Sequence, residues 1–422
     1  MRRMLLFLML TFSLAAMAAP NPEKVAEVQA GTEKRAVVSW WGFNADDATE
    51  YVQAAIDSGA PQVVVPYVGS PWVVRPIKLR GNLELIFEPG VLVLAKPGEF
   101  KGKGDSLFSV SDASNIIVRG YGATLRMRKA DYQGEAYEKA EWRMTLAING
   151  CINVTVEGVR LESSGGDGIY IGCTSTQPYC RDVVIRDVVC HDHHRQGISV
   201  IGASNLLIEN CVMSGTNGTA PQAGIDLEPN GPEERLENCV IRNCIFEDNA
   251  GAGMLIYARP LSRETPPVSI LFENCYVKSG KDAGIAVGAV KDDGPKGTIE
   301  FRNCTVENTQ GSGAYVYDKS AENARVIFND CKWSNVAIKG DRPPILFHAR
   351  RDGLATTIGG VDLIDCRLYD NTDRPAVVIE GEEGTQARDI SGKITVLSPA
   401  TPRMEVKVPA ENVSLNLQHE AR

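Results

Sequence analysis

The sequence predicts an all-β fold: a single-stranded right-handed parallel β-helix, or solenoid, with a short N-terminal capping helix. A glycine-led strand motif, first seen as GDGIYIG at 166–172, recurs about every 29 residues along the chain. Between its copies lies a second stretch that ends in Asn-Cys, as in LLIENC and CVIRNC. Period-two alternation within these short runs indicates strands. A repeat of this length without a helix buries its apolar residues only when neighbouring copies stack into one continuous core.

Residues 1–18 are expected to be a cleavable secretory signal peptide. Two arginines precede a short apolar run that ends at Ala16, Met17 and Ala18. A basic start, an apolar stretch and a small-x-small site are the features of such a signal. No later run reaches the roughly 18 apolar residues of a membrane helix. We therefore expect a secreted or periplasmic protein without a membrane span.

The mature chain, 19–422, is expected to form one domain. Its segment 46–58 is predicted to be an amphipathic capping helix, because Asp47 has a glutamate three positions later, the spacing of a capping box. Repeating coils are expected over about 60–380, where strand-like runs follow one another. Residues 381–422 are interpreted as late strands or a C-terminal cap.

The formal net charge of −9 at pH 7 argues against nucleic acid or an anionic membrane as the main partner. Nucleic acids and anionic membranes both favour a basic face, so neither is expected as the main partner. An acidic substrate is still compatible with this charge, because local clusters of arginine can bind one.

Most of the eleven cysteines are expected to be buried free thiols. Six of them close the Asn-Cys or Asp-Cys stretch on successive turns, so they should stack as a ladder of small side chains beside a ladder of asparagines. The cysteines are Cys211, Cys244, Cys275, Cys304, Cys331 and Cys366, and the asparagines are Asn210, Asn243, Asn274 and Asn303. Cys173 and Cys180 bracket a loop and are candidates for a disulfide, with Cys151 as a rival partner. The sequence leaves open whether this disulfide forms.

The stretch WGFNADDATEYVQAAIDSGAPQVVVPYVG resembles the opening of the pectin-lyase-like β-helix superfamily. This superfamily includes polygalacturonases and other glycoside hydrolases, polysaccharide lyases, epimerases and phage tailspikes. GGDGIYI is similar to the N-T-D-G-I stretch of polygalacturonases, and the resemblance implies that Asp167 matches their catalytic aspartate. On the next turn those enzymes have two adjacent aspartates, whereas this chain has Arg195 and Gln196. The resemblance therefore implies a polysaccharide-active β-helix that departs from a standard polygalacturonase.

Asp226 and Glu228 are the first candidates for catalysis. Ile225 and Leu227 face the core by pattern, so the residues between and after them face outward, on one side of a strand. Glycoside hydrolysis needs one protonated carboxyl and one carboxylate, and crowded acids raise one another's pKa. We predict that Asp226 and Glu228 form this pair, with Asp167 as the third acid.

The other candidate residues lie on neighbouring turns of the same face. With turns about 4.8 Å apart, Asp167 lies about 10 Å from Asp226, and three clustered histidines fall between them. His193 and His194 are expected to orient groups or to relay protons beside a carboxylate-lined groove. The insertion 127–142 is expected to bring the aromatic residues Tyr132, Tyr137 and Trp142 to its border. The predicted substrate-binding residues are Arg195, Gln196, His191, Tyr170, Tyr257, Arg259 and Trp142.

Three functions stay open at this point. The favoured one is an exported glycoside hydrolase that uses the carboxylates and acts as a monomer on a polysaccharide or oligosaccharide. The second is a polysaccharide lyase or C5-epimerase, in which a histidine, tyrosine or arginine removes the C5 proton of a uronate. The third is a non-catalytic carbohydrate-binding β-helix, which would not need several titratable side chains in one patch.

No cofactor and no metal site are predicted. His191 and His193 could present two imidazoles to zinc, but no further ligand has a fixed spacing to them. Calcium bound by Asp192, Asp226 or Glu228 stays open, because oxygen ligands are present without a calcium-loop signature.

Overall fold

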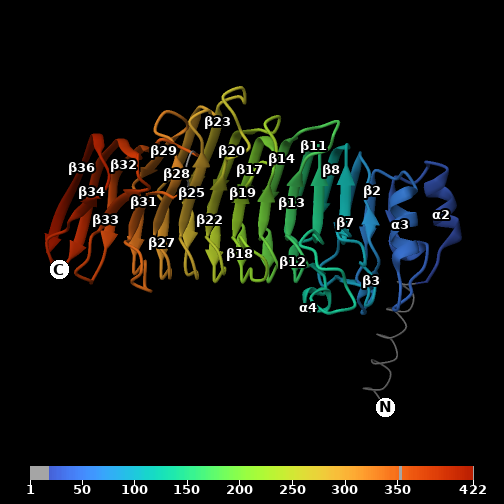
Figure 1. The fold of residues 1–422 in the computed structure, drawn as a ribbon. Helices are drawn as coiled ribbons and strands as arrows, with labels where there is room; N and C mark the ends of the chain where they lie inside the picture. Colours follow the sequence, from blue (N-terminus) through green and yellow to red (C-terminus); the bar gives the residue numbers. More distant parts are fainter. Residues whose placement is uncertain (1–18, 351–353, 422) are drawn as a thin grey trace, which may run out of the picture.

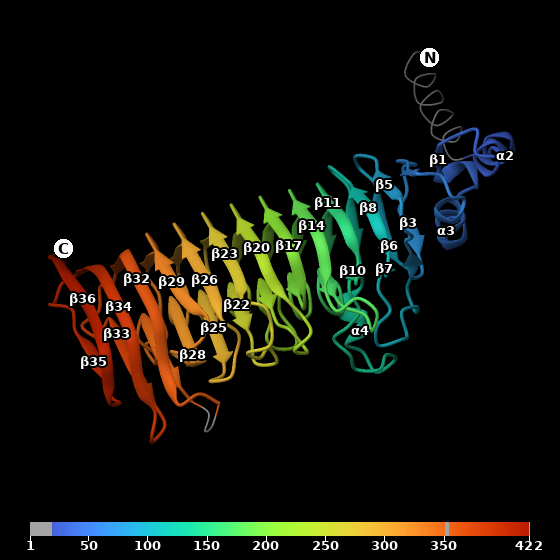
Figure 2. The same ribbon diagram turned by 90° about the horizontal axis from the view of Figure 1, so that it is seen from above.

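The computed structural model describes residues 19–350 and 354–421, and the predicted signal peptide lies outside them. The strands stack in parallel register into one elongated right-handed β-helix, with its N-terminal helices at one end and the last strands at the other (Figures 1 and 2). Two sheets run along its whole length: sheet A has 24 strands and sheet B has 12. The predicted fold class is confirmed. Within the described residues, no helix is long and apolar enough to cross a membrane.

Each turn of the coil contributes one strand to sheet B and then, in most turns, two strands to sheet A. The strands of sheet B are β4 (Ile77–Lys78), β7 (Phe108–Ser111), β10 (Leu146–Asn149), β13 (Ile169–Gly172), β16 (Ile198–Val200), β19 (Ile225–Leu227), β22 (Met254–Tyr257), β25 (Ile285–Val290), β28 (Ala314–Lys319), β31 (Ile345–Ala349), β33 (Val377–Gly381) and β35 (Met404–Val406). The strands of sheet A are β1 (Arg35–Val37), β2 (Gln62–Val65), β3 (Trp72–Val74), β5 (Leu83–Phe87), β6 (Leu92–Ala95), β8 (Ser114–Arg119), β9 (Thr124–Arg126), β11 (Ile152–Glu157), β12 (Arg160–Glu162), β14 (Cys180–Arg186), β15 (Val189–His191), β17 (Ala203–Glu209), β18 (Val212–Ser214), β20 (Leu236–Arg242), β21 (Ile245–Glu247), β23 (Val268–Glu273), β24 (Tyr276–Val277), β26 (Gly297–Arg302), β27 (Thr305–Glu307), β29 (Arg325–Asn329), β30 (Lys332–Ser334), β32 (Thr357–Tyr369), β34 (Gln386–Ser398) and β36 (Ala410–Ala421).

In the described part of the chain, helices are confined to the N-terminal end and one insertion. They are α2 (Pro22–Gln29), the 3₁₀ turn η1 (Val38–Trp40), α3 (Thr49–Asp57) and α4 (Lys129–Tyr132). The predicted capping helix corresponds to α3, whose first turn is held by Asp47 Oδ1, a hydrogen-bond acceptor for Thr49 N at 3.1 Å. Glu50 does not complete the capping box, because its carboxylate pairs with Arg75 at 2.6 Å. The short, polar helix α2 has no counterpart in the sequence-based prediction.

In several consecutive coils, the turn between the two sheet A strands is held by stacked asparagines. Asn243, Asn274 and Asn303 have φ values of 54°, 53° and 49°, in the left-handed region that asparagine tolerates better than most residues. Asn303 Nδ2 donates to Asn274 Oδ1 at 2.7 Å, and Asn274 Nδ2 donates to Asn243 Oδ1 at 3.4 Å. These amides form the expected ladder and connect each turn with the preceding one.

Replacing Asn274 tests this ladder. Asn274→Ala should lower the free energy of unfolding by about 1–2 kcal/mol, because alanine loses both the ladder hydrogen bonds and the preference for the left-handed conformation. Asn274→Gly keeps the backbone freedom and should lose less. Thermal melts of the two variants beside wild type would check this order, and equal losses would show that backbone conformation contributes nothing measurable.

The six ladder cysteines are buried as expected, and all eleven cysteines are free thiols in the structure. The candidate disulfide between Cys173 and Cys180 is absent. Cys180 is fully buried and accepts a hydrogen bond from Cys151 N at 3.3 Å, whereas Cys173 Sγ lies 3.1 Å from Glu234 Oε1. The two sulfurs therefore have separate environments, one inside the coil and one at its surface.

Thiol titration would check this pattern. A thiol reagent should react with eleven thiols in the unfolded protein. Cys173 should be the residue that reacts quickly in the native state, because it alone among the cysteines is partly exposed. A titration that finds two fewer thiols in the unfolded, unreduced protein would instead reveal a disulfide.

Candidate active site

Asp226 faces outward from sheet B, as the sequence predicts, but it does not reach solvent. It stands in register with Ser199 on β16 and Leu255 on β22, and Ser199 in turn pairs with Tyr170 on β13. The exposed fraction of Asp226 is 0 %. The expectation of a solvent-facing carboxylate pair was wrong for Asp226, because side chains from the turn before β16 cover it.

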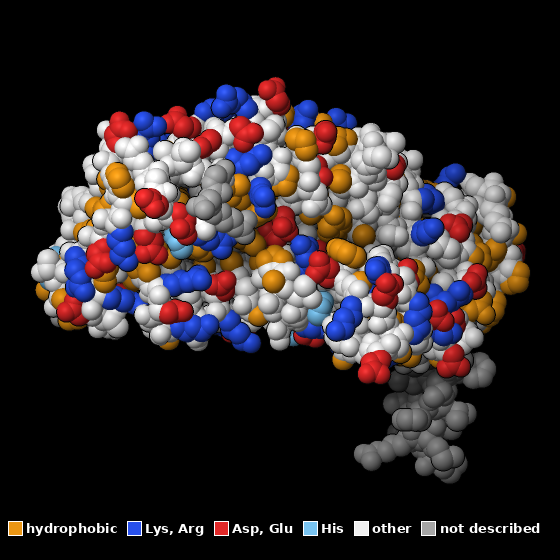
Figure 3. Space-filling view, viewed as in Figure 1, with side chains coloured by type: hydrophobic (Ala, Val, Ile, Leu, Met, Phe, Trp, Pro, Cys, Tyr) orange, Lys and Arg blue, Asp and Glu red, His pale blue; other side chains and the backbone are white. Residues whose placement is uncertain are grey.

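Arg195 lies at the centre of the side chains beside Asp226. Its Nη2 donates to Glu228 Oε2 at 3.0 Å, and its Nη1 lies 4.0 Å from Asp167 Oδ2. Its Nε lies 3.8 Å from Glu141 Oε1. One guanidinium thus connects an acid from the turn before β13, an acid directly after β19 and an acid from the insertion. In the orientation of Figure 1, acidic and basic side chains gather near the middle of the visible face (Figure 3).

Burial gives two of these acids unusual protonation. Asp167 is fully buried, and burial raises the pKa of its carboxyl to about 7, although the charge of Arg195 acts in the opposite direction. Burial also raises the pKa of Asp226 well above its usual range, and the nearby Glu228 adds to this shift. No side chain donates a hydrogen bond to Asp167 Oδ1 or Oδ2 among the described residues. Both carboxyls are therefore suited to hold a proton near neutral pH.

Gln196 fixes the orientation of Asp226. Its Nε2 donates to Asp226 Oδ2 at 2.8 Å, and its Oε1 accepts from Ala223 N at 2.8 Å. Gln196 is fully buried, so its amide is turned to the acid and to the main chain. The structure thus gives this predicted substrate-binding residue the contacts of a positioning residue.

The imidazoles of the three histidines form side-chain hydrogen bonds with hydroxyl groups and not with the acids. His193 Nδ1 lies 2.8 Å from Ser164 Oγ, His194 Nε2 lies 2.9 Å from Thr219 Oγ1, and His191 Nδ1 lies 3.0 Å from Ser214 Oγ. His191 belongs to β15 of sheet A, away from the row of outward side chains on sheet B. Burial lowers the pKa of His193 to about 3, which makes it a weak base. The three imidazoles are thus turned toward these hydroxyl groups, and the expected row of histidines beside the acids does not form.

The other predicted binding residues divide into two groups. Tyr170 and Tyr257 are half-buried on strands of sheet B, and the pKa of Tyr170 is raised by burial and by the charge of Asp167. Arg259 is exposed, and the exposed fraction of Trp142 is 49 %. Sequence reasoning missed Glu141, which contacts Arg195, because nothing in the repeat predicts how the insertion folds.

The insertion does not present its two tyrosines to this face. Tyr132 and Tyr137 are buried, with ring centroids 5.2 Å apart, and the Arg143 guanidinium lies over both rings. The two rings do not reach this face because Tyr132, at the end of α4, and Tyr137, which follows α4, pack inward against each other. Beside α4 lies a cavity of about 600 Å³ whose lining includes Arg126, Lys129 and Asp192. Asp167, Asp226 and Glu228 do not line this cavity.

No group of three or more His, Cys, Asp or Glu is placed to hold a metal ion within 19–350 and 354–421. Calcium at Asp192, Asp226 or Glu228 stays the open alternative that the sequence left.

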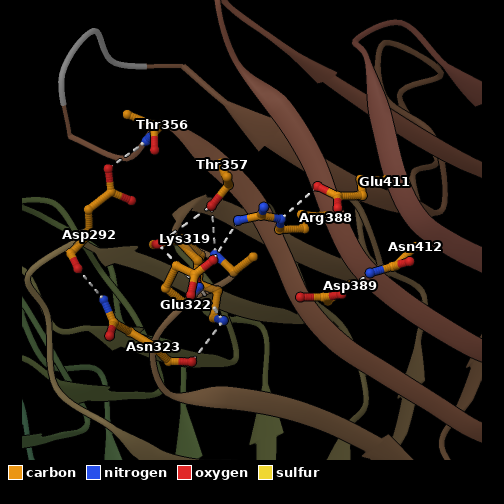
Figure 4. Close-up of polar contacts among 12 residues, drawn as sticks. Asp292, Lys319, Glu322, Asn323, Thr356, Thr357, Arg388, Asp389, Glu411 and Asn412 are labelled. Atoms are coloured by element: carbon orange, nitrogen blue, oxygen red, sulfur yellow. Dashed lines mark hydrogen bonds and ion pairs between the residues drawn. The ribbon is translucent and has the colours of Figure 1, made fainter.

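A second buried polar cluster lies near the C-terminal end (Figure 4). Lys319 is fully buried, and its Nζ donates to the carbonyl oxygens of Ser320, Asn323 and Gly360 at 2.8, 3.4 and 3.4 Å. Burial lowers the pKa of Lys319 to about 7. Because these acceptors are main-chain oxygens, the ammonium connects neighbouring loops, and no acidic side chain of residues 19–350 or 354–421 forms an ion pair with it.

The chain is similar to known proteins in sequence and in fold. A family model described as "Right handed beta helix region" matches residues 142–289. Two uncharacterized proteins of Bacillus subtilis strain 168 are similar over part of the chain. YclG is 31% identical over 193 residues, 42% of this chain and 32% of YclG, and the SPbeta prophage-derived YorA is 27% identical over 195 residues, 43% of this chain and 33% of YorA. The match thus spans about a third of the length of these relatives.

Solved structures share the architecture at low sequence identity. An exopolygalacturonase of Yersinia enterocolitica superposes with a TM-score of 0.60 at 15% identity, over 91% of this chain and 78% of that chain. The tailspike of Escherichia coli bacteriophage HK620 gives 0.54 at 12% identity, over 93% and 80%. The A-module of the Azotobacter vinelandii mannuronan C-5 epimerase AlgE6 gives 0.50 at 15% identity, over 91% and 99%. The chain therefore has the right-handed parallel β-helix fold that these structures share.

Proposed function

We propose that this protein is an exported polysaccharide-degrading enzyme, a glycoside hydrolase that works with the carboxyl groups of Asp167, Asp226 and Glu228. The observation that carries the proposal is the Arg195 cluster, in which one guanidinium contacts Asp167 on one side and Glu228 on the other. The relatives with the same fold support a carbohydrate substrate, since they include an exopolygalacturonase and a tailspike crystallised with a pentasaccharide. Export rests on the predicted signal peptide.

The roles follow from protonation and position. Asp167, with its pKa near 7, is the proton donor to the glycosidic oxygen of the leaving sugar. Glu228 is the carboxylate, because it accepts a hydrogen bond from the Arg195 guanidinium and is more exposed than the two buried aspartates. Sequence reasoning favoured Asp226 with Glu228 as the acid–base pair. The nearby Glu228 raises the pKa of Asp226, so Asp226 is better suited to stay protonated beside Glu228 than to act from the opposite side of the sugar.

The reaction balances with water as the co-substrate. Asp167 gives its proton to the leaving oxygen while the bond from that oxygen to the anomeric carbon breaks. Water adds to the anomeric carbon, and Glu228 takes the proton that the water loses. Glu141, Glu228 and Arg195 are the cluster members nearest to solvent, with side-chain exposures of 28%, 27% and 14%. Substrate hydroxyl groups must therefore compete with the Arg195–Glu228 ion pair before the buried acid can donate.

Arg195 also favours a second candidate, a uronate lyase or C5-epimerase. A guanidinium among acids could neutralise a sugar carboxylate and so ease removal of the C5 proton. The histidines are poor bases for this reaction, because burial lowers the pKa values of His193 and His194. The charged Arg195 cannot also accept this proton, so the role of base would fall to Tyr170, whose pKa is raised by burial.

One experiment separates these functions. Purified protein would be incubated with a panel of plant, algal and host polysaccharides, and new reducing ends and the ultraviolet absorbance of unsaturated uronate would be followed together. Reducing ends without that absorbance, lost in Glu228→Gln, support hydrolysis. Reducing ends with the absorbance overturn it in favour of a lyase.

The control is Glu237→Gln, which removes a half-exposed acid on β20 of sheet A, whose side-chain exposure is 44%. It should hydrolyse at the wild-type rate. If neither signal appears on any polymer that the protein binds, the hydrolase proposal fails and the non-catalytic carbohydrate-binding function is favoured.

A further inference from the structure

The outer face of sheet B changes character on the C-terminal side of the acids. Leu255, Ala286 and Tyr315 follow Asp226 in strict register on β22, β25 and β28. With strands about 4.8 Å apart, Tyr315 lies about 14 Å from Asp226 along the coil. The row is apolar at Leu255 and Ala286 and becomes aromatic at Tyr315. A glycan that extends from the acids along this face would reach the tyrosine after several sugar units.

Two tyrosines form a platform on this turn. The rings of Tyr315 and Tyr317 are stacked, with centroids 4.9 Å apart and an interplanar angle of 28°. Tyr317 lies over Gly288 of the preceding turn, where an added Cβ would stand 2.1 Å from the ring. Only glycine leaves room for the ring there. The Tyr317 ring therefore lies along the outer face of sheet B, over the preceding turn and in the direction of the acids.

Two arginines lie over this platform, one from each side of β31. The Arg342 guanidinium, from the loop before the strand, lies 5.2 Å from the Tyr315 centroid. The Arg350 guanidinium, directly after the strand, lies 4.1 Å from the Tyr317 centroid. Their side-chain exposures are 40% and 34%, so both reach solvent while an aromatic face orients them.

Each arginine also has an acidic neighbour that holds it in place. Arg350 Nε donates to Asp318 Oδ2 at 3.1 Å, and Asp318 is almost fully buried. Arg342 Nη1 lies 3.6 Å from Asp282, whose side-chain exposure is 53%. A guanidinium presents five N–H donors, so one carboxylate contact does not use its whole binding capacity. The pair is preorganised for an anion that accepts two parallel hydrogen bonds, such as a carboxylate or a sulfate group.

We propose that Arg342 and Arg350, on the Tyr315–Tyr317 platform, form an anion-binding subsite that takes a carboxylate or sulfate group of the glycan. This inference rests on the proposed function, because it treats the outer face of sheet B as the path of the substrate. It names the substrate class: a polysaccharide that carries negative charge several sugar units from the bond that is cleaved. The net charge of −9 makes such a subsite necessary for an anionic polymer, since the molecule as a whole would repel it.

Binding to matched polymers tests the subsite without any need for turnover. The probes are dextran against dextran sulfate and methyl-esterified pectin against polygalacturonate, measured by affinity electrophoresis at low and high salt. The protein carries Asp167→Asn, so that the polymer is not consumed. We expect binding to at least one charged polymer and not to its neutral counterpart. The combination of Arg342→Gln and Arg350→Gln should weaken it by about tenfold or more, since a hydrogen bond to a charged group contributes at least that much.

The two pairs of polymers identify which anionic group of the glycan the subsite binds. Preference for polygalacturonate indicates a uronate, and preference for dextran sulfate indicates a sulfated sugar. Arg302→Gln is the matched control, because Arg302 is a half-exposed, acid-paired arginine on β26 of sheet A. It should bind as the parent does. Equal binding of neutral and charged polymers, unchanged binding after both substitutions, or no binding to either charged polymer at low salt overturns the proposal.

The proposed function can fail separately from this subsite. Charge-dependent binding that requires Arg342 and Arg350, in a protein that cleaves no glycan, would leave the subsite standing and remove the hydrolase. Cleavage of neutral polymers that is insensitive to both substitutions would do the reverse.

Discussion

Asp167→Asn should abolish glycan cleavage and, at neutral pH, stabilise the fold. Asparagine has nearly the same shape as aspartic acid but cannot give a proton, so the rate should fall by about 10²- to 10⁴-fold, the usual contribution of a general acid. The stability gain has a separate cause. Burial raises the pKa of the carboxyl to about 7, so the folded protein binds this proton more tightly than the unfolded chain does.

The sign of the pH dependence follows from that difference. Below about pH 4 the group is protonated in both states and the fold keeps the full benefit. As the pH rises through 7, the buried carboxyl must ionise, and that benefit is lost. The asparagine variant has no proton to lose, so at pH 8 it should be more stable than wild type by on the order of 2 kcal/mol, with the gain fading toward pH 4.

Thermal melts at pH 4, 6 and 8 beside activity assays would check both parts. The control is Asp46→Asn, at an exposed position in the loop before α3, which should change neither activity nor the pH profile of stability. Loss of activity without a pH-dependent gain in stability would show that Asp167 ionises normally and that its role is not that of a proton donor.

Arg195→Gln should have the opposite effect on stability. The guanidinium lowers the pKa values of Asp167 and Asp226, and without it two buried carboxyls lose their main positive neighbour. Removing one member of such a buried charge cluster typically costs about 3–5 kcal/mol. The loss should be greatest at high pH, where the acids ionise, and should shrink as the pH falls and protonation removes the uncompensated charge.

Melts from pH 5 to 9 would measure this slope, and kinetics would show whether activity falls with it. Arg195→Lys keeps the positive charge but lacks the planar fork that contacts Glu228 and Asp167 at once. It should recover most of the stability at pH 8 and little of the activity. If Arg195→Gln is equally destabilising at pH 5 and pH 9, Arg195 acts through packing and not through charge.

The fold could be predicted from the sequence because its signals are periodic. The recurrence of Ile169, Ile198 and Ile225 fixes the register of sheet B, and that register places Asp226 on the outer face. Periodicity says which way a side chain points from its strand. It cannot say what lies above that side chain, and the covering residues Arg195 and Gln196 come from an aperiodic turn.

The same limit explains the histidines and the insertion. His193 and His194 lie in that turn, and their inward direction depends on contacts with Ser164 and Thr219 that no repeat encodes. Glu141 stands in a segment with no counterpart in other turns. These residues are separated in sequence and meet only because one loop folds over another. The candidate acids could therefore be selected from the sequence, but their burial and their common partner could not.

The stacking of the coil also decides where the molecule is least stable. Each turn contacts mainly its two neighbours, so local opening is easiest at the ends and spreads inward turn by turn. Three strands of sheet B precede β13 and six follow β19 along the coil. Amide hydrogens of β16 should accordingly exchange more slowly than those of β4 or β35. Fraying at either end can therefore proceed over several turns while the acid cluster keeps its geometry.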